Sequence, residues 1–211
     1  MYARREKMKK LVFSLILAVM LAVLPVQLFA VMSGDPIQTF ACPFLITSGG
    51  QGAGSKMLRL LINQSKKFTL GEDRDFWLED ETPERLNDID TGRYTTLVIV
   101  ISVTEKGLGA SGITIEDEIN FLKQVLEHAK ARNMKLIAVS MEADARAPKL
   151  PTNGNERIID LVCPKADWII SLKANNADER FTKISRQYGI PLTIIDKPMD
   201  LVKAAPDIFL K

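Results

Sequence analysis

The sequence predicts the α/β class, as a three-layer α/β/α sandwich with a mainly parallel, Rossmann-like or flavodoxin-like sheet of five to six strands. Three observations predict it. Strand-like and helix-like segments alternate from Cys42 onward. Residues 97–101 (LVIVI) are an unbroken apolar run rich in β-branched side chains, as expected of a strand buried on both faces. Residues 44–61 change from a short apolar run, through a glycine-rich turn, to a helical pattern.

Six short apolar segments are candidate strands, bounded by polar or turn-forming residues. They are residues 44–48, a weak one within 68–79, 95–103, 135–140, 168–172 and 192–196. Helix signals lie between them. Thr82, Pro83 and Glu84 mark one helix start, and Thr114 with Asp117 approximates a capping box at another.

Two of the expected helices carry an apolar stripe. The first stripe consists of Ile115, Ile119, Leu122, Leu126 and Ala129. In the second helix, Phe181, Ile184 and Tyr188 share one face, and Gly189 and Pro191 end the helix. Helices between parallel strands predict right-handed crossovers.

The first 30 residues differ in composition from the rest of the chain. They contain five basic residues and one acidic residue, then the apolar run 11–24, and Ala30 is small enough to precede a cleavage site. The pattern predicts a signal peptide over residues 1–30, with an uncleaved membrane anchor as the alternative, and a single α/β domain over 36–211. We therefore expect an extracytoplasmic protein, periplasmic or secreted, that meets a membrane only through an uncleaved N-terminus.

The charge of the remaining chain argues against polyanionic partners. The whole sequence has 28 basic and 26 acidic residues, a net charge of +2. Without residues 1–30 the counts become 23 and 25, a net charge of −2. A domain with this charge lacks the basic surface that nucleic acid or an anionic membrane surface would need, so neither is an expected partner.

Polar loops follow the expected strands and predict a binding site. Ligands in open parallel sheets bind beyond the carboxyl ends of the strands. Two glycine-rich loops and several cationic side chains would meet there, which favours a small anion held by backbone N–H groups and positive charge. The candidate ligand-binding residues are Ser48, Gly49, Gly50, Gln51, Lys106, Gly109, Ser111, Glu142, Arg146 and Lys173. The alternative is that the glycines serve only turns and helix starts.

The phosphate motifs of nucleotide enzymes do not fit this glycine-rich loop. Residues 49–56 (GGQGAGSK) resemble a Walker loop, but Lys56 follows Ser55, where the motif places lysine directly after the second glycine. In a dinucleotide fingerprint the third glycine position also falls on Ser55, whose side chain would hinder close helix packing. We expect no cofactor, and an extracytoplasmic location would supply little ATP or NAD.

Signals for catalysis are weak. His128, the only histidine, lies off the apolar stripe of its helix, so a serine–histidine triad is not expected. An enzyme would have to rely on Ser48 or Ser111 activated by Lys106. The catalytic residues of such an enzyme cannot be assigned from this sequence.

Neither a metal site nor a disulfide is strongly indicated. Glu105, Glu142 and Asp144 could supply metal ligands, but their spacing matches no known metal motif, and we expect no metal site. Cys42 and Cys163 each precede a proline at the start of a candidate strand, which places both at the amino-terminal edge of the sheet. Two buried thiols are the default expectation, and a disulfide in an oxidising compartment is the alternative.

Several segments together resemble a known family. They are ITSGGQG (46–52), EKGLGASGI (105–113), CPKADW (163–168), ADERFTKIS (177–185) and GIPLT (189–193). The set is similar to an uncharacterised bacterial family of small exported α/β proteins, classed as a domain of unknown function, and it spans nearly the whole chain after residue 30. The resemblance implies the fold and the export of the protein, and it brings no activity and no catalytic residues.

The leading functional hypothesis is an extracytoplasmic domain that binds a small anionic ligand at the carboxyl edge of its sheet and is not an enzyme. One alternative is a nucleotide-independent hydrolase or transferase. The other is a noncatalytic module that docks a protein partner through Trp77, whose acidic neighbours are unusual for a core tryptophan.

Overall fold

The computed structural model describes residues 32–80, 83–142 and 153–211. Its central sheet has seven strands in the order β1-β8-β7-β6-β5-β3-β4. They are β1 (Met32–Gly34), β3 (Phe44–Gly49), β4 (Phe76–Leu78), β5 (Thr96–Ile101), β6 (Lys135–Ser140), β7 (Trp168–Leu172) and β8 (Leu192–Ile195). Neighbouring strands pair in parallel, except that β1 is antiparallel to β8. The parallel strands follow the flavodoxin-like order, which confirms the predicted fold class.

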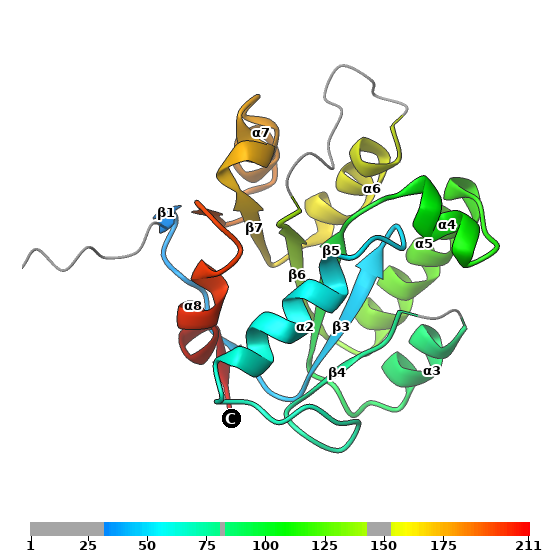
Figure 1. Cartoon of the computed structure of the whole chain (residues 1–211), viewed down its shortest axis with the longest axis horizontal. Coiled ribbons are helices and arrows are strands. Elements are labelled where there is room, and N and C mark those ends of the chain that lie inside the picture. Colours follow the sequence, from blue (N-terminus) through cyan, green and yellow to red (C-terminus); the bar gives the residue numbers. More distant parts are fainter. Residues whose placement is uncertain (1–31, 81–82, 143–152) are drawn as a thin grey trace, which may run out of the picture. The chain divides into compact units, whose positions relative to one another are not determined.

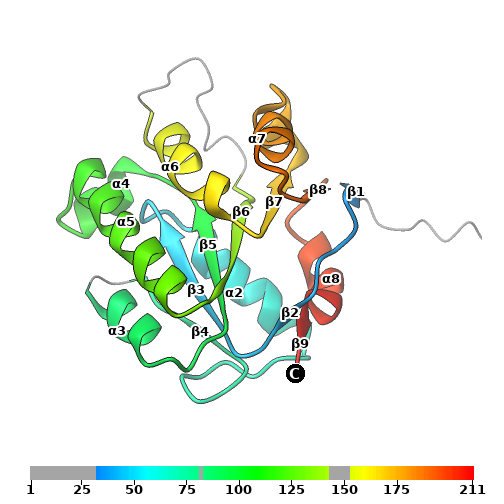
Figure 2. The ribbon, with the colours of Figure 1, turned by 180° about the vertical axis from the view of Figure 1, so that it is seen from behind.

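Helices cover both faces of this sheet (Figures 1 and 2). One face carries α2 (Gly54–Gln64) and α8 (Asp200–Ile208). The other carries α3 (Glu84–Asp90), α5 (Ile115–Ala131), α6 (Gly154–Val162) and α7 (Arg180–Tyr188). A short helix, α4 (Glu105–Ala110), follows β5, and two 3₁₀ helices, η1 (Cys163–Lys165) and η2 (Lys173–Asn176), flank β7.

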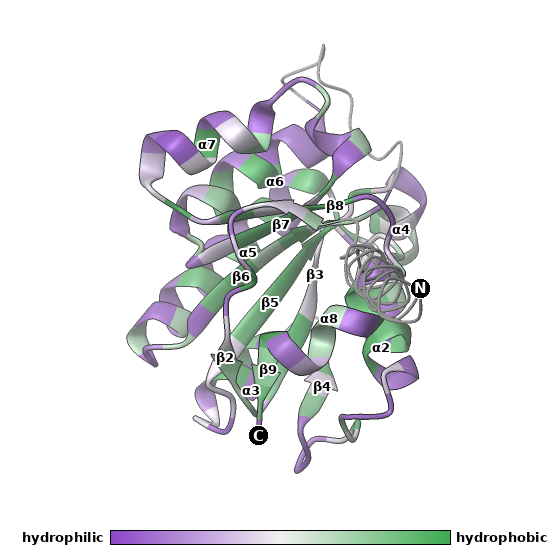
Figure 3. Cartoon of the chain, turned by 90° about the vertical axis from the view of Figure 1, so that its left-hand side faces the viewer, coloured by the Kyte–Doolittle hydropathy of each residue, from purple (hydrophilic) through white to green (hydrophobic). Residues whose placement is uncertain are grey.

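Each face of the sheet has its own hydrophobic core, because successive strand residues point to opposite sides. On β5, Leu97, Ile99 and Ile101 pack under α3, α5 and α6, whereas Val98 and Val100 pack under α2. All five are at most 2% exposed. Figure 3 shows the resulting pattern, with hydrophobic residues on the sheet and polar residues on the outward sides of the helices.

Local sequence signals located most elements correctly. The strands 135–140 and 168–172 have the predicted bounds. The capping box of Thr114 and Asp117 is present, and Gly189 ends α7 in a left-handed conformation. Three short strands were not predicted: β1 at one edge, and β2 (Phe40–Ala41), which pairs in parallel with β9 (Phe209–Leu210).

The two cysteines are free and lie on opposite sides of the sheet. Cys163 is buried in the core beneath α5, α6 and α7, and Cys42 is half-buried against the core beneath α2 and α8. The sheet between them prevents a disulfide. Burial raises the pKa of the Cys42 thiol to about 11.

The predicted signal peptide or anchor, residues 1–30, lies outside the described residues. Among the helices that the structure does describe, none is long and apolar enough to cross a bilayer.

Candidate functional site

The loops that follow β3 and β5 meet at the carboxyl edge of the sheet. The strand order reverses between these two strands, which is where a flavodoxin-like sheet usually opens a crevice. Here Gln51 and Val103 form an antiparallel bridge, and the Gly52 N–H donates to the carbonyl of Ser102 at 2.7 Å. Gly107 of α4 packs so closely that a Cβ atom there would lie 1.7 Å from the carbonyl oxygen of Gln51. The two loops therefore fill the crevice with their own backbone.

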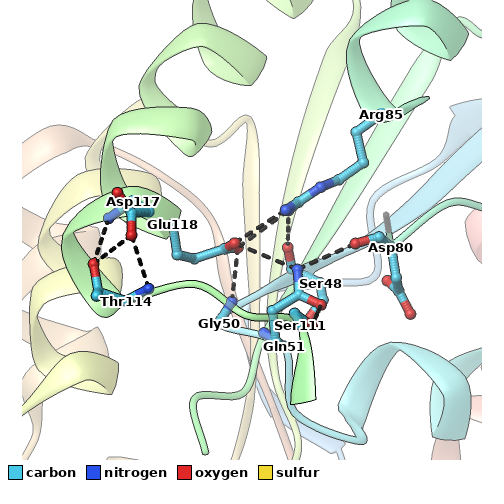
Figure 4. A network of polar contacts seen from close by, with 9 residues as sticks. All are labelled: Ser48, Gly50, Gln51, Asp80, Arg85, Ser111, Thr114, Asp117 and Glu118. Carbon is cyan, nitrogen blue, oxygen red and sulfur yellow. Dashed lines mark hydrogen bonds and ion pairs between the residues drawn. The ribbon is translucent and has the colours of Figure 1, made fainter. Parts of the chain in front are cut away.

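A buried ion pair contacts the backbone of the first of these loops (Figure 4). Arg85 of α3 and Glu118 of α5 have fully buried side chains, and Nη2 of Arg85 lies 3.0 Å from Oε2 of Glu118. Arg85 Nη1 donates to the carbonyl of Ser48 at 2.9 Å, and Glu118 Oε1 accepts from the Gly50 N–H at 3.1 Å. The pair thus fixes the loop at two points, through one backbone acceptor and one backbone donor.

Gln51 connects the loop to its surroundings. Its backbone has a φ of 60°, a left-handed conformation that is unfavourable for a residue with a side chain. Its N–H donates to Ser48 Oγ at 3.0 Å, and its Nε2 donates to the carbonyl of Asp80 at 3.1 Å. Ser111, which follows α4, donates its hydroxyl hydrogen to Gln51 Oε1 at 3.3 Å. These contacts offset the conformational cost and orient the Gln51 side chain.

Asp80 is a half-buried acid beside the loop. Ser55, in the first turn of α2, donates to Asp80 Oδ2 at 2.9 Å, whereas Asp80 Oδ1 is buried and has no hydrogen-bond partner among the residues that the structure describes. Burial raises the pKa of this carboxyl, and the Ser55 hydrogen bond only partly opposes the shift. An orphaned oxygen and a raised pKa in one group are typical of functional sites.

Replacing Asp80 by asparagine is expected to change how stability depends on pH. A raised folded-state pKa means that the folded protein binds the proton more tightly, so this contribution to stability is present below the unfolded value of 3.8 and is lost as pH rises through the folded pKa. Asparagine has no proton to lose. Urea unfolding from about pH 4 to 7 should therefore show the Asp80→Asn variant gaining stability relative to wild type as pH rises.

The matched control for this experiment is Asp73→Asn, at an aspartate whose side chain is 86% exposed. Its stability profile should run parallel to that of wild type. If the stability of Asp80→Asn also changed with pH in parallel with wild type, the raised pKa assigned to Asp80 would be contradicted.

A second set of polar groups ties together the loops after β5, β6 and β7. The hydroxyl of Ser102 donates to the Glu142 carboxylate. Asn175 Nδ2 donates to Ser140 Oγ and to the carbonyl of Glu142, both at 3.0 Å. Asn155, at the start of α6, accepts from the Val103 N–H at 2.9 Å. The carboxyl edge is thus one connected hydrogen-bonded surface from β4 to β7.

The structure separates the ten predicted site residues by accessibility. Ser48, Gly49 and Gly50 are buried, and Ser48 and Gly50 already use their polar groups within the protein. Four residues lie at the outer surface of the two touching loops: Gln51, Lys106, Gly109 and Ser111.

The other three predicted residues are more distant or undescribed. Glu142 is half-buried and bound by Ser102. Lys173 is exposed, with its Nζ 3.8 Å from Asp196 Oδ1. Arg146 lies outside the described residues. The structure therefore brings together only the part of the predicted site that belongs to the loops after β3 and β5.

Sequence analysis missed Arg85, Glu118 and Asp80, although a signal for the first two was present. Glu118 lies three residues after Ile115 and four before Leu122, so it falls on the apolar stripe of α5. Arg85 lies four residues before the buried Ile89 and shares its face of α3. A charged residue on each of two core-facing stripes indicates a buried pair.

The other candidate features have structural explanations. His128 Nδ1 lies 2.9 Å from Asp90 Oδ1, within hydrogen-bond distance. The His128 side chain is 39% exposed. Trp77, on the edge strand β4, is half-buried and packs against the core beneath α3 and α5. Within the described ranges, no group of three or more histidine, cysteine or acidic residues could hold a metal ion.

These features define an α/β domain of flavodoxin-like strand order with a hydrogen-bonded loop surface at the carboxyl edge of its sheet. The chain belongs to the family described as Domain of unknown function (DUF6305), whose model matches residues 41–209. The predicted membership of an uncharacterised family is thus confirmed. A comparison with curated proteins finds no match.

Two solved structures show a distant likeness. The psychrotrophic esterase EstA from Pseudoalteromonas sp., in a structure inhibited by monoethylphosphonate, is 14% identical with a TM-score of 0.32, over 77% of this chain and 90% of the esterase chain. TesA is 12% identical with a TM-score of 0.27, over 71% of this chain and 77% of that chain. A likeness of this degree supports no statement about activity.

Proposed function

We propose that this protein is an exported, noncatalytic domain that binds a small anion, a phosphate or a carboxylate, on the outer surface of the loops after β3 and β5. The proposal rests on the preorganised backbone of the loop after β3. A fully buried Arg85–Glu118 pair holds this backbone, and on the other side Gln51 and Ser111 bond to each other and fix the outer surface next to Lys106. Groups held in advance in one geometry lose less freedom on binding a ligand.

Lys106 supplies the positive charge in this proposal. It is exposed in the first turn of α4, next to Gly107, which packs directly on Gln51. Among the described residues no carboxylate lies within ion-pair distance of it. Glu118 does not oppose it, because Arg85 neutralises that carboxylate, and Glu105 is exposed to water that screens its charge.

The geometry favours binding over hydrolysis. A serine nucleophile needs an adjacent base and an open path to substrate. Ser48 is 1% exposed and its hydroxyl accepts from Gln51, and Ser111 bonds to the amide oxygen of Gln51, which is not a base. Export enters the proposal through the composition of residues 1–30 alone.

The proposal predicts that Lys106→Gln weakens anion binding. Calorimetric titration of the purified protein with inorganic phosphate and with succinate at low ionic strength should give saturable binding to at least one of them. Loss of a charged hydrogen bond should cost about 1.5–3 kcal/mol of binding free energy in this variant. Added salt should also weaken binding, because Lys106 is exposed.

Lys67→Gln is the matched control, since Lys67 is also exposed but lies in the loop after α2. Its affinity should equal that of wild type. The proposed site would be wrong if neither anion bound saturably, or if Lys106→Gln and Lys67→Gln bound equally well.

A further inference from the structure

The opposite edge of the sheet contains a cavity that the loops at the carboxyl edge do not reach. It lies where β6 begins, between the last turns of α5 and the segment that joins α6 to β7. Its volume of about 910 Å³ is within the range of small-molecule sites. From this cavity we infer a second binding site, for an amphipathic carboxylate with a straight apolar chain.

The floor of the cavity is apolar. Leu126, Met134 and Leu136 line it and are 6–8% exposed, and the half-buried Leu161 of α6 completes one wall. These side chains already belong to, or pack against, the core beneath α5 and α6. An apolar chain laid on this floor would be removed from water along its length, which contributes about 25 cal/mol per Å² of buried apolar surface.

The rim of the cavity carries an excess of positive charge. Its charged side chains are four lysines and two acids: Lys123, Lys130, Lys135, Lys165, Glu127 and Asp167. The net charge is therefore +2. A rim of this sign around an apolar floor matches a ligand that has one anionic head and an apolar body.

Lys130 is the rim residue assigned to the carboxylate head. Lys135 is paired with Asp167 at 2.7 Å, and Lys165 Nζ donates to the carbonyl of Leu161 at 2.9 Å. Lys130 is exposed, and within the described ranges it has no hydrogen-bond or ion-pair partner. Lys123 is seven residues earlier on α5, about two turns and 10 Å away on the same face, where it lies along the body of the ligand.

The test is a titration of the purified protein with octanoate, followed through its backbone amide NMR signals. Saturable shifts should cluster at Met134–Lys135 and at Asp167. Octanamide, the uncharged isostere, should bind about tenfold more weakly, since it lacks the charged hydrogen bond. Lys130→Gln should weaken octanoate binding by a similar factor and leave octanamide binding unchanged, and Lys67→Gln should leave both unchanged.

Three results would overturn the inference. They are the absence of saturable shifts at millimolar octanoate, equal binding of octanoate and octanamide, and shifts confined to the loops around Gln51 and Ser111. The last result would assign the carboxylate to the carboxyl edge. The cavity and the loops around Gln51 lie at opposite edges of the sheet. The positions of the shifted signals therefore show which of the two proposed sites binds the carboxylate and which does not.

Discussion

Replacing Arg85 by methionine is expected to lower the free energy of unfolding by about 3–5 kcal/mol, because it leaves the Glu118 carboxylate buried without its partner. Both side chains are fully buried, so water cannot take over the lost contacts. The substitution also removes the donor to the Ser48 carbonyl, and the first loop should lose its fixed shape. Urea unfolding of wild type and variant measures the difference.

A double variant separates the stability lost because a buried charge is unpaired from the stability lost because a side chain has changed. In Arg85→Met with Glu118→Gln no charge remains, and the glutamine oxygen can still accept from the Gly50 N–H. This protein should be more stable than the Arg85→Met single variant. Arg157→Met serves as the control, because it breaks an equally bidentate but exposed pair with Glu116, and it should have a far smaller effect. Similar losses for Arg85→Met and Arg157→Met would contradict this role for the buried pair.

Replacing Gly107 by alanine should destabilise the fold by about 3 kcal/mol. The added Cβ would lie 1.7 Å from the carbonyl oxygen of Gln51, a backbone atom that cannot rotate aside. Either α4 or the loop after β3 must then move, and the Gln51–Val103 bridge would be disturbed. Thermal or urea unfolding measures the loss.

Gly109→Ala is the matched control in the same short helix. A Cβ at Gly109 meets no atom within 4 Å, so alanine should raise stability by about 0.4–1 kcal/mol through the smaller entropy of the unfolded chain. A loss of stability in Gly107→Ala together with a gain in Gly109→Ala would be evidence that the fold depends on the close contact between the two loops. Equal effects would show that α4 can shift away from Gln51 at little cost.

The central fold could be predicted from the sequence because each of its signals is local. Runs such as residues 135–140 and the capping box at Thr114 depend on neighbours in the chain, so periodicity and capping rules locate them. The strands β1, β2 and β9 have two or three residues each and pair with partners far away in the sequence. No local pattern specifies such a pairing.

For the candidate site, the sequence predicted that the loops after β3 and β5 meet at the carboxyl edge of the sheet, and they do. Ligand binding at these loops stays a prediction. The sequence did not show that the glycines at 52 and 107 serve close contact between these loops, since that depends on the third dimension. The buried Arg85–Glu118 pair likewise joins helices whose residues lie far apart in the chain, and the charges alone do not identify the partners.

The pairing of β2 with β9 has a consequence for the order in which the domain assembles. Phe40 lies opposite Phe209, and the ring of Phe209 stacks on that of Phe44 with centroids 3.7 Å apart. Joining residues so far apart in the chain carries a large loop-closure entropy, whereas β3, β5 and β6 are separated by much shorter stretches of chain. The central strands can therefore form first and the β2–β9 seam last. Phe40 and Phe209 both belong to the core beneath α2 and α8, so opening of the β2–β9 pair is expected to expose that core to water.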